Sequence, residues 1–266
     1  MADLLAEAYE RALELEKAGD VCAAEAWRDV LALNEADPGG AAIRLAALGE
    51  GETPDVAPPA YVAALFDQHA EVFDLILVDQ LEYGVPMLAR ERLQALQLGP
   101  FERFLDLGCG TGLAAEAFED MADNMTGVDI AEGMVEIAAE KELYDRLFTA
   151  EAVRFLNSRS ADGEWDLIAA TDVLPYLGDA APFFHAVARR AAYGGVFTFS
   201  TETLPAEAFS EDGWRVTPHH RFAHDPEYIA EVLADAGFDM LDQVDIVVRR
   251  EQGAPIRGHL FTARKR

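Results

Sequence analysis

The stretch FLDLGCGTG, residues 104–112, decides the fold of this chain. Apolar residues and one aspartate, Asp106, lead directly into glycines at every second position, which are Gly108, Gly110 and Gly112. A short apolar run that ends in glycines predicts a buried strand followed by a tight loop. Because glycine has no Cβ atom, such a loop lets a ligand rest against bare backbone. The stretch therefore predicts a ligand site at the end of a strand.

Predicted strands and helices alternate along the chain from residue 101 onward. The strands are expected within 103–108, 125–130, 147–156, 166–174, 194–202, 240–251 and 258–265, and the helices within 111–122, 132–143, 179–191 and 225–238. This alternation is typical of a doubly wound, mostly parallel sheet. The last two strands have no helix between them, so they should form an antiparallel pair. The predicted fold class is α/β: a Rossmann-like doubly wound sheet with an antiparallel C-terminal strand pair and an N-terminal helical hairpin, the sheet domain covering residues 101–266.

Residues 1–58 precede this alternation and are predicted to form a helical hairpin with a linker. Apolar residues recur at helical spacing within 4–19 and again within 21–38. The two helices resemble about one tetratricopeptide repeat, so the hairpin either binds a protein partner or simply packs on the main domain. Residues 49–60 are rich in glycine, proline and acids, and are predicted to be a linker without regular structure.

Residues 59–100 return to helical spacing and lead into the sheet. A helix is expected over 61–81, where Phe66 and Phe73 lie near helical spacing, and a second helix begins with Pro86. These aromatic residues either belong to an ordinary core or form a lid over the ligand site.

Composition limits the classes of partner. The 266 residues carry a formal net charge of −28, and such an acidic surface repels phosphate backbones, so we expect no nucleic acid partner. The apolar stretches are too short to span a membrane, and the N-terminus carries acids where a secretory signal carries bases, so a cytoplasmic protein is expected. Cys22 and Cys109 have no spacing that suggests a disulfide framework or metal site, and no metal is predicted.

The expected ligand carries a nucleoside. Asp129 ends the next predicted strand, where a carboxylate can accept hydrogen bonds from both hydroxyls of a ribose. A nicotinamide dinucleotide would favour a glycine at position 113, which is Leu113, and Asp106 would lie badly near phosphates. Asp106 suits a positive group, such as the ammonium of an amino-acid tail. These features favour S-adenosylmethionine as the cofactor.

Five stretches of the sequence resemble the class I S-adenosylmethionine-dependent methyltransferases. They are FLDLGCGTG (104–112), GVDIAEGMVEIA (127–138), AEAVRFL (150–156), DLIAATDVLPYLGD (166–179) and GGVFTFSTE (194–202). With its N-terminal hairpin and the stretch FDQHAEVFD (66–74), the chain looks like the smaller group of methyltransferases that carry a tetratricopeptide repeat.

The resemblance implies a set of cofactor-binding residues. Asp106, Gly108, Cys109 and Gly110 would line the methionine part, and Asp129 would hold the ribose. The remaining implied contacts are Ile130, Met134, Glu151 and Ala152 on the adenine side, Thr171 and Asp172 beside the sulfonium, and Phe66 and His69 on the lid.

Methyl transfer needs alignment and exclusion of water, and it needs a base only if the acceptor loses a proton. The candidates for a base or for the acceptor pocket are His219, His220, His224, Tyr83 and Tyr176. The function predicted is methyl transfer to a small molecule. The alternatives are a protein methyltransferase that recruits its substrate through the hairpin, an inactive nucleotide-binding adaptor and a nicotinamide oxidoreductase.

Overall fold

The computed structural model describes residues 2–266 of the chain, without the side chains of Ala2 and Asp79. The α-helices are α1 (Ala2–Ala18), α2 (Ala23–Leu33), α3 (Ala41–Ala47), α4 (Pro59–Asp67), α5 (Val85–Ala95), α6 (Leu113–Phe118), α7 (Glu132–Glu140), α8 (Ala152–Leu156), α9 (Ala181–Ala188) and α10 (Pro226–Asp235). Shorter helical segments are η1 (Ala70–Val72), η2 (Leu75–Gln80), η3 (Leu174–Tyr176) and η4 (Ala206–Ala208). The strands are β1 (Phe101–Leu107), β2 (Ala122–Asp129), β3 (Arg146–Thr149), β4 (Trp165–Ala170), β5 (Ala191–Glu202), β6 (Trp214–Val216), β7 (Phe222–His224), β8 (Phe238–Glu251) and β9 (Ala254–Lys265). Among the described residues, none of the helices has the length and hydropathy to cross a membrane.

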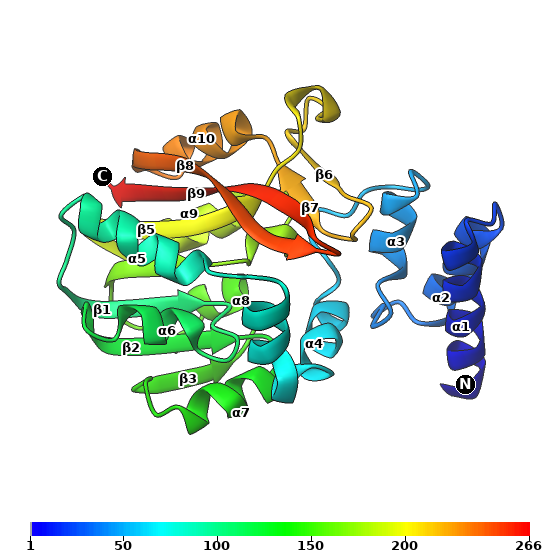
Figure 1. The fold of residues 1–266 in the computed structure, drawn as a ribbon, viewed down its shortest axis with the longest axis horizontal. Helices are drawn as coiled ribbons and strands as arrows, with labels where there is room; N and C mark the ends of the chain where they lie inside the picture. Colours follow the sequence, from blue (N-terminus) through cyan, green and yellow to red (C-terminus); the bar gives the residue numbers. More distant parts are fainter. Residues whose placement is uncertain (1) are drawn as a thin grey trace.

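The strands form one sheet whose main order is β3-β2-β1-β4-β5-β7-β6, with β9 added beside β5 and β8 beside β9 (Figure 1). The first five strands pair in parallel, whereas β9 runs antiparallel to both β5 and β8. The predicted doubly wound sheet with its antiparallel C-terminal pair is confirmed. The chain winds outward from β1 in one direction and from β4 in the other, so the gap between β1 and β4 is where such sheets bind ligands.

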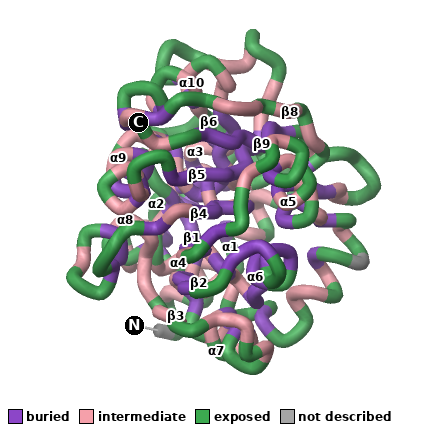
Figure 2. Tube along the Cα trace, turned by 90° about the vertical axis from the view of Figure 1, so that its left-hand side faces the viewer, coloured by how far each residue is buried: buried purple, intermediate pink, exposed green. Residues whose placement is uncertain are grey.

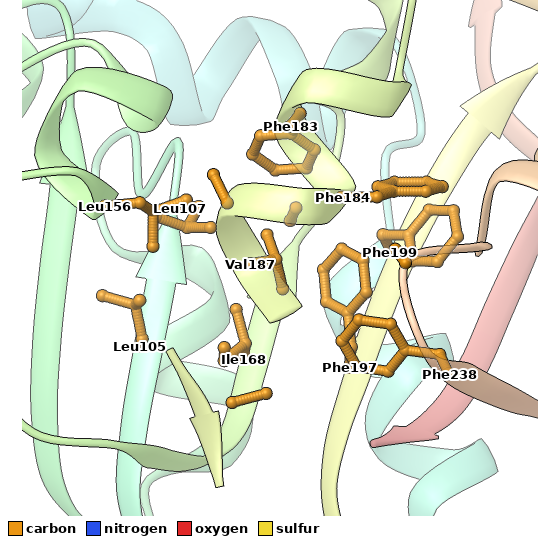
Figure 3. Packing of buried hydrophobic residues seen from close by; sticks show 14 of the residues in the cluster. Leu105, Leu107, Leu156, Ile168, Phe183, Phe184, Val187, Phe197, Phe199 and Phe238 are labelled. Atoms are coloured by element: carbon orange, nitrogen blue, oxygen red, sulfur yellow. The ribbon is translucent and has the colours of Figure 1, made fainter. Parts of the chain in front are cut away.

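Two apolar layers hold the sheet between its helices. On one face, Phe183, Phe184 and Val187 of α9 pack on Phe197 and Phe199 of β5, and aliphatic residues continue the cluster over β1 and β4 (Figure 3). The other face packs against α5 and α6. In Figure 2 the buried residues follow the central strands, while the outer helices alternate between buried and exposed sides. A sheet covered on both faces explains why its strands read as nearly continuous apolar runs.

The predicted N-terminal hairpin is formed by α1 and α2, and it stands to one side of the sheet domain (Figure 1). Its own apolar cluster centres on Trp27 and includes Ala41 and Leu45 of α3. On its other side, α3 places Ile43 in a cluster with Tyr176 and Phe222 of the sheet domain. The third helix therefore joins the hairpin to the sheet domain.

The expected continuous helix over 61–81 is wrong. The chain instead forms α4, a 3₁₀ turn (η1) and a π-helical segment (η2). Two carboxylates explain the breaks: Asp67 accepts a hydrogen bond from Gly133 N at 2.9 Å, and Asp74 binds Thr111 and Lys141. These long-range contacts compete with regular helical geometry.

The predicted linker is also more structured than expected near its end. Ala57 N donates to Tyr176 O at 2.9 Å, and Gly178 N donates to Asp55 O at 2.8 Å. Val56 forms an isolated bridge with Leu177. This part of the linker is therefore paired to the loop after β4. A second difference lies at 214–224, where β6 and β7 form a short antiparallel pair that the sequence did not predict.

Candidate functional site

A pocket, here called the main pocket, opens at the carboxyl ends of β1, β2 and β4. Its empty volume is about 1020 Å³, including space open to solvent, which is large enough for a nucleoside-sized ligand. The predicted residues that line it are Phe66, Tyr83, Gly108, Cys109, Gly110, Asp129, Ile130, Glu151, Ala152, Thr171, Asp172 and Tyr176. The sequence thus identified residues that meet in one place, although their roles toward a ligand stay a prediction.

The glycine loop turns sharply over the end of β2. Gly108 N and Cys109 N both donate to Val128 O, at 2.8 and 3.0 Å. A Cβ on Gly108, whose φ is 69°, would lie 2.4 Å from a methyl group of Val173. A Cβ on Gly110, at φ 52°, would meet only the ring of Phe73, at 3.8 Å. Gly108 is therefore required for packing within the protein, whereas Gly110 presents bare backbone to open pocket.

Asp129 holds the loop in place from the neighbouring strand. Its Oδ2 accepts from Gly110 N at 2.9 Å, and its Oδ1 accepts from Ala131 N at 2.8 Å. Burial raises the pKa of this carboxyl, while the backbone amides act to lower it. The carboxylate also lines the main pocket, and its lone pairs that do not bind these amides remain available to a ligand.

Asp106 lies outside the lining of the main pocket. It is fully buried, and its Oδ2 accepts from the hydroxyl of Tyr144 at 2.6 Å. Its Oδ1 is buried without a hydrogen-bond partner among the described residues. Burial raises the pKa of Asp106 to about 7, because a charged carboxylate loses solvation there. A buried carboxylate oxygen with spare hydrogen-bonding capacity next to a glycine loop fits a ligand with a positive group.

The raised pKa of Asp106 makes the free energy of unfolding depend on pH. Between its ordinary value of 3.8 and about 7, Asp106 holds a proton in the folded chain that the unfolded chain has lost. The Asp106 contribution to the free energy of unfolding should therefore fall as pH rises through this window and stay constant above it. Denaturant titrations across the window should show a smaller fall for Asp106→Asn, which cannot titrate but can still accept from Tyr144. Identical pH slopes in the two proteins would contradict this expectation.

Aromatic residues close one side of the main pocket. The ring of Phe66 meets the edges of Phe73 and Tyr176, with centroids 5.8 and 5.4 Å apart. Phe66 lies near the C-terminal end of α4, and Phe73 directly follows η1. The residues predicted to share one lid helix therefore come from two segments. Val56 and Ala57 line the same pocket, although their segment was expected to be only a linker.

A second hollow, here called the side chamber, adjoins the main pocket and shares several of its walls. The shared residues are Phe66, Phe73, Leu77, Asp172 and Tyr176. Leu65, Ile76 and Leu81 add apolar wall, while Arg221, Arg249 and Glu251 lie at its polar end. The empty volume of the side chamber is about 860 Å³, including space open to solvent.

The polar end of the side chamber is a charge cluster, formed by Asp172, Glu202, Arg221, Arg249 and Glu251. Arg221 donates to Asp172 and Glu202, each at 2.6 Å, and to the Tyr176 hydroxyl at 2.5 Å. Arg249 donates to Glu202 at 2.5 Å and to Glu251 at 2.9 and 2.5 Å. Burial acts to lower the pKa of Arg221, but the carboxylates outweigh it and raise that pKa. Both guanidinium groups therefore stay charged, and each of their nitrogens donates to one of these partners.

Only one of the three histidines proposed as a base reaches these hollows. His219 lines the side chamber, and its Nδ1 lies 2.8 Å from Glu251 Oε2. His220 instead pairs with Glu16 of α1, at 3.3 Å. His224 is fully buried with its Nε2 3.1 Å from Gly178 O, and burial lowers its pKa to about 4. The structure brings neither His220 nor His224 to the ligand site.

The other predicted residues differ in their surroundings. His69 lies between α4 and η1 and lines the side chamber, with Nδ1 2.9 Å from Leu65 O. Met134 lines neither hollow and is buried beside Ala131, with Phe66 and Phe73 packed against it. Glu151 lines the main pocket while both its oxygens cap α8, accepting from backbone amides at 2.8 and 2.7 Å.

Sequence reasoning missed the charge cluster, apart from Asp172. Its residues come from the end of β4, the end of β5, the turn before β7 and the end of β8, and they are up to 79 positions apart in the chain. Charged residues in a strand at the edge of a sheet are usually predicted to face solvent. Nothing in the local spacing of these charged residues indicates that they pair with one another. They come together because β5 pairs with β7 and β9, and β9 in turn pairs with β8.

Comparisons with known proteins agree with the fold. A family described as methyltransferase domain matches residues 81–243. A malonyl-[acyl-carrier protein] O-methyltransferase of Legionella pneumophila is 26% identical over 63% of this chain and 58% of its own length. A ubiquinone biosynthesis O-methyltransferase of Hydrogenovibrio crunogenus is 31% identical over 36% of this chain and 41% of its own length.

Both alignments thus cover only about half of the relatives. Among solved structures, an S-adenosylmethionine-dependent methyltransferase of Clostridium acetobutylicum superposes with a TM-score of 0.55 at 19% identity, covering 76% of this chain and 99% of that one. That likeness shows the shared fold. Because the matched family spans more than half of the residues, this chain belongs to the family of methyltransferase domains.

Proposed function

We propose that this protein is an S-adenosylmethionine-dependent methyltransferase that acts on a small-molecule acceptor. The observation that carries the proposal is one wall of the main pocket, where bare backbone at Gly110 and the carboxylate of Asp129 lie side by side, joined by a 2.9 Å hydrogen bond. That pairing suits a nucleoside with an amino-acid tail. Family membership and the ubiquinone-biosynthesis relative support the activity and a small acceptor.

The residues of the main pocket would divide the cofactor among them. Asp129 would accept the ribose hydroxyls, and the loop from Gly108 to Gly110 would border the methionine part near Asp106. Ile130, Glu151 and Ala152 would border the adenine, with Met134 supporting Phe66 from behind. When bound, the cofactor supplies a methyl group already activated on a positive sulfur.

The protein's own task is then to align the acceptor and exclude water. Asp172 lines both the main pocket and the side chamber, and its neighbour Thr171 lines the main pocket; at this junction a methyl group would pass between ligands. Phe66, Phe73 and Tyr176 form apolar wall on both hollows and keep water from that junction. The side chamber would hold the acceptor.

Calorimetric titrations with S-adenosylmethionine, S-adenosylhomocysteine and NAD test this proposal directly. We expect both sulfur nucleosides to bind with dissociation constants on the order of micromolar and NAD to bind far more weakly, a difference of several kcal/mol. Tight binding of NAD without binding of the sulfur nucleosides would favour an oxidoreductase and contradict the proposal.

Asp129→Ala should lower the affinity for S-adenosylhomocysteine at least about tenfold. The ribose hydroxyls lose a charged acceptor, a loss of about 1.5–3 kcal/mol, and Gly110 N loses the partner that orders the loop. The matched control is Asp145→Ala, because Asp145 also accepts from a backbone amide, that of Met125 at 2.8 Å, but lies outside both hollows. Equal dissociation constants for the two variants would refute the role of Asp129.

We further propose that the hairpin of α1 and α2 is an accessory unit of tetratricopeptide-like form. Its residues line neither hollow, and its contacts with the rest include α3, the Arg28–Glu50 pair and the Glu16–His220 pair. A protein-borne acceptor recruited by this hairpin is the second candidate function, favoured by the malonyl-[acyl-carrier protein] relative.

Removal of residues 1–35 should leave S-adenosylhomocysteine binding intact. The cut keeps Asp37, which caps α3 by accepting from Ala41 N and Ala42 N at 2.7 and 2.9 Å. The shortened chain should melt earlier, because the face of α3 that packs on Trp27 becomes exposed. Removal of residues 1–58 should weaken binding, because it deletes Val56 and Ala57 from the pocket wall. Calorimetry below the melting temperatures of both deletion variants distinguishes a loss of binding from a loss of stability. Loss of binding after removal of residues 1–35 would place the hairpin in the site.

A further inference from the structure

The side chamber has features that would select the chemistry of the acceptor. This inference rests on the proposed function. One side is apolar, built from Leu65, Ile76 and Leu81. The polar part of its lining is the charge cluster together with His219. An occupant that matches both parts has an apolar body and one polar head that points toward His219 and Asp172.

The charge cluster disfavours a negatively charged head. Three carboxylates face two guanidinium groups, and every guanidinium nitrogen that donates already binds Asp172, Glu202, Glu251 or Tyr176. A carboxylate from an acceptor would share these two guanidinium groups with three carboxylates and would lie beside them. Like charges held close together in a poorly solvated site repel strongly. The head that fits is therefore neutral or positive.

His219 is placed to take a proton from such a head. Glu251 Oε1 is held by Arg249 at 2.5 and 2.9 Å, and its Oε2 lies 2.8 Å from His219 Nδ1. A carboxylate can only accept, so Nδ1 donates to Glu251, and in the neutral imidazole Nε2 then has a free lone pair. The His219 side chain is half exposed and borders the chamber, which leaves Nε2 accessible. Glu251 thus acts as a positioning residue and His219 as the group that meets the acceptor.

We propose that the side chamber binds an amphipathic acceptor whose nucleophilic atom bears a proton, as in a hydroxyl or an amine, and that His219 removes this proton. The acceptor atom forms a bond to the methyl carbon while the carbon–sulfur bond breaks, and its electron pair stays on the sulfur, which loses its positive charge. The proton moves to His219 Nε2, and the resulting imidazolium is stabilised by Glu251. A carboxylate acceptor, which has no proton to lose, has no use for this pair.

Three probes with the same apolar tail test the selection: 4-pentylphenol, 4-pentylbenzylamine and 4-pentylbenzoate. Each is titrated by calorimetry into the full chain saturated with S-adenosylhomocysteine. We expect the phenol or the amine to bind at least about tenfold more tightly than the benzoate, and the better of the two identifies the head. Equal or tighter binding of the benzoate overturns the inference, and so does binding by none of the probes. Failure of S-adenosylhomocysteine itself to bind would instead overturn the proposed function on which the inference rests.

Rates of labelled methyl transfer to the phenol and the amine test the proton acceptor. His219→Gln should lower kcat about 100-fold or more with little change in KM, because a base acts in the transition state. Glu251→Gln should lower kcat less, again without a matching change in KM. The matched control is His185→Gln, since His185 forms a similar imidazole–carboxylate pair with Asp235 at 3.2 Å on the exposed surface of α9. An unchanged kcat in His219→Gln, or transfer to the benzoate in preference to the other probes, overturns the inference.

Discussion

Gly110→Val should abolish binding of S-adenosylhomocysteine while the chain still folds. The nearest protein atom to a Cβ at this position is the ring of Phe73 at 3.8 Å, so an added side chain meets open pocket and not a packed core. The isopropyl group would occupy the volume in which the ligand lies against the loop. It would also be strained at a φ of 52°, a region that β-branched residues avoid. Both effects act on the ligand site and leave the sheet intact.

Two further variants separate occupation of the pocket from backbone strain. Gly49→Val introduces the same side chain at a similarly positive φ of 75°, where a Cβ meets no atom within 4 Å and no pocket is near. It should lose stability through strain but bind S-adenosylhomocysteine normally in calorimetry. Gly110→Ala adds a single carbon and should give an intermediate affinity. Normal binding by folded Gly110→Val would show that the loop does not cradle the ligand.

Arg249→Met should lower the free energy of unfolding by about 3–5 kcal/mol, as expected when one member of a buried ionic cluster is removed. Arg249 is 3% exposed and so is Glu202, which it contacts at 2.5 Å. Without Arg249, Glu251 loses its guanidinium partner, and Asp172 and Glu202 keep only that of Arg221. Methionine has similar length but cannot compensate the charge, so the loss comes from electrostatics more than from packing. Denaturant titration at neutral pH measures the effect.

The neighbouring residue provides the control for this prediction. Arg250→Met breaks an exposed pair, in which Arg250 Nε lies 3.1 Å from Glu82, and should cost at most about 1 kcal/mol. Adding Glu202→Gln to Arg249→Met removes one uncompensated carboxylate and should restore part of the stability, which reveals the coupling between the two residues. Equal losses for Arg249→Met and Arg250→Met would mean that the cluster contributes no more than a surface pair.

The parts of the fold that the sequence predicted correctly depend on local patterns. Short apolar runs ending in glycine or acid marked the strands, and Asp225 marked the start of α10, where it accepts from Glu227 N at 2.9 Å. The glycine loop and Asp129 could be found because both follow adjacent parallel strands, whose carboxyl ends must meet at one edge. Their meeting in one pocket follows from strand order, which alternation of strands and helices strongly constrains.

The segment over 61–81 shows where periodicity failed. Phe66, Ala70 and Phe73 recur as in a helix because all of them face one apolar cluster around Met134. That spacing is also compatible with a broken chain. Asp67 and Asp74 make hydrogen bonds to residues more than 30 positions away, and these contacts set the backbone into 3₁₀ and π-helical turns.

By itself, the sequence determined the doubly wound sheet, the glycine loop and Asp129, because each depends on the spacing of neighbouring residues along a strand or turn. Only the tertiary structure decided the pocket wall at Val56 and the charge cluster around Arg249. It also selected His219 over His220 and His224. These features depend on which strands pair at the sheet edge, and they place residues together that are separated by dozens of positions. Local periodicity cannot predict such partners. A buried ion pair requires only that two segments distant in the sequence bring opposite charges within hydrogen-bonding distance.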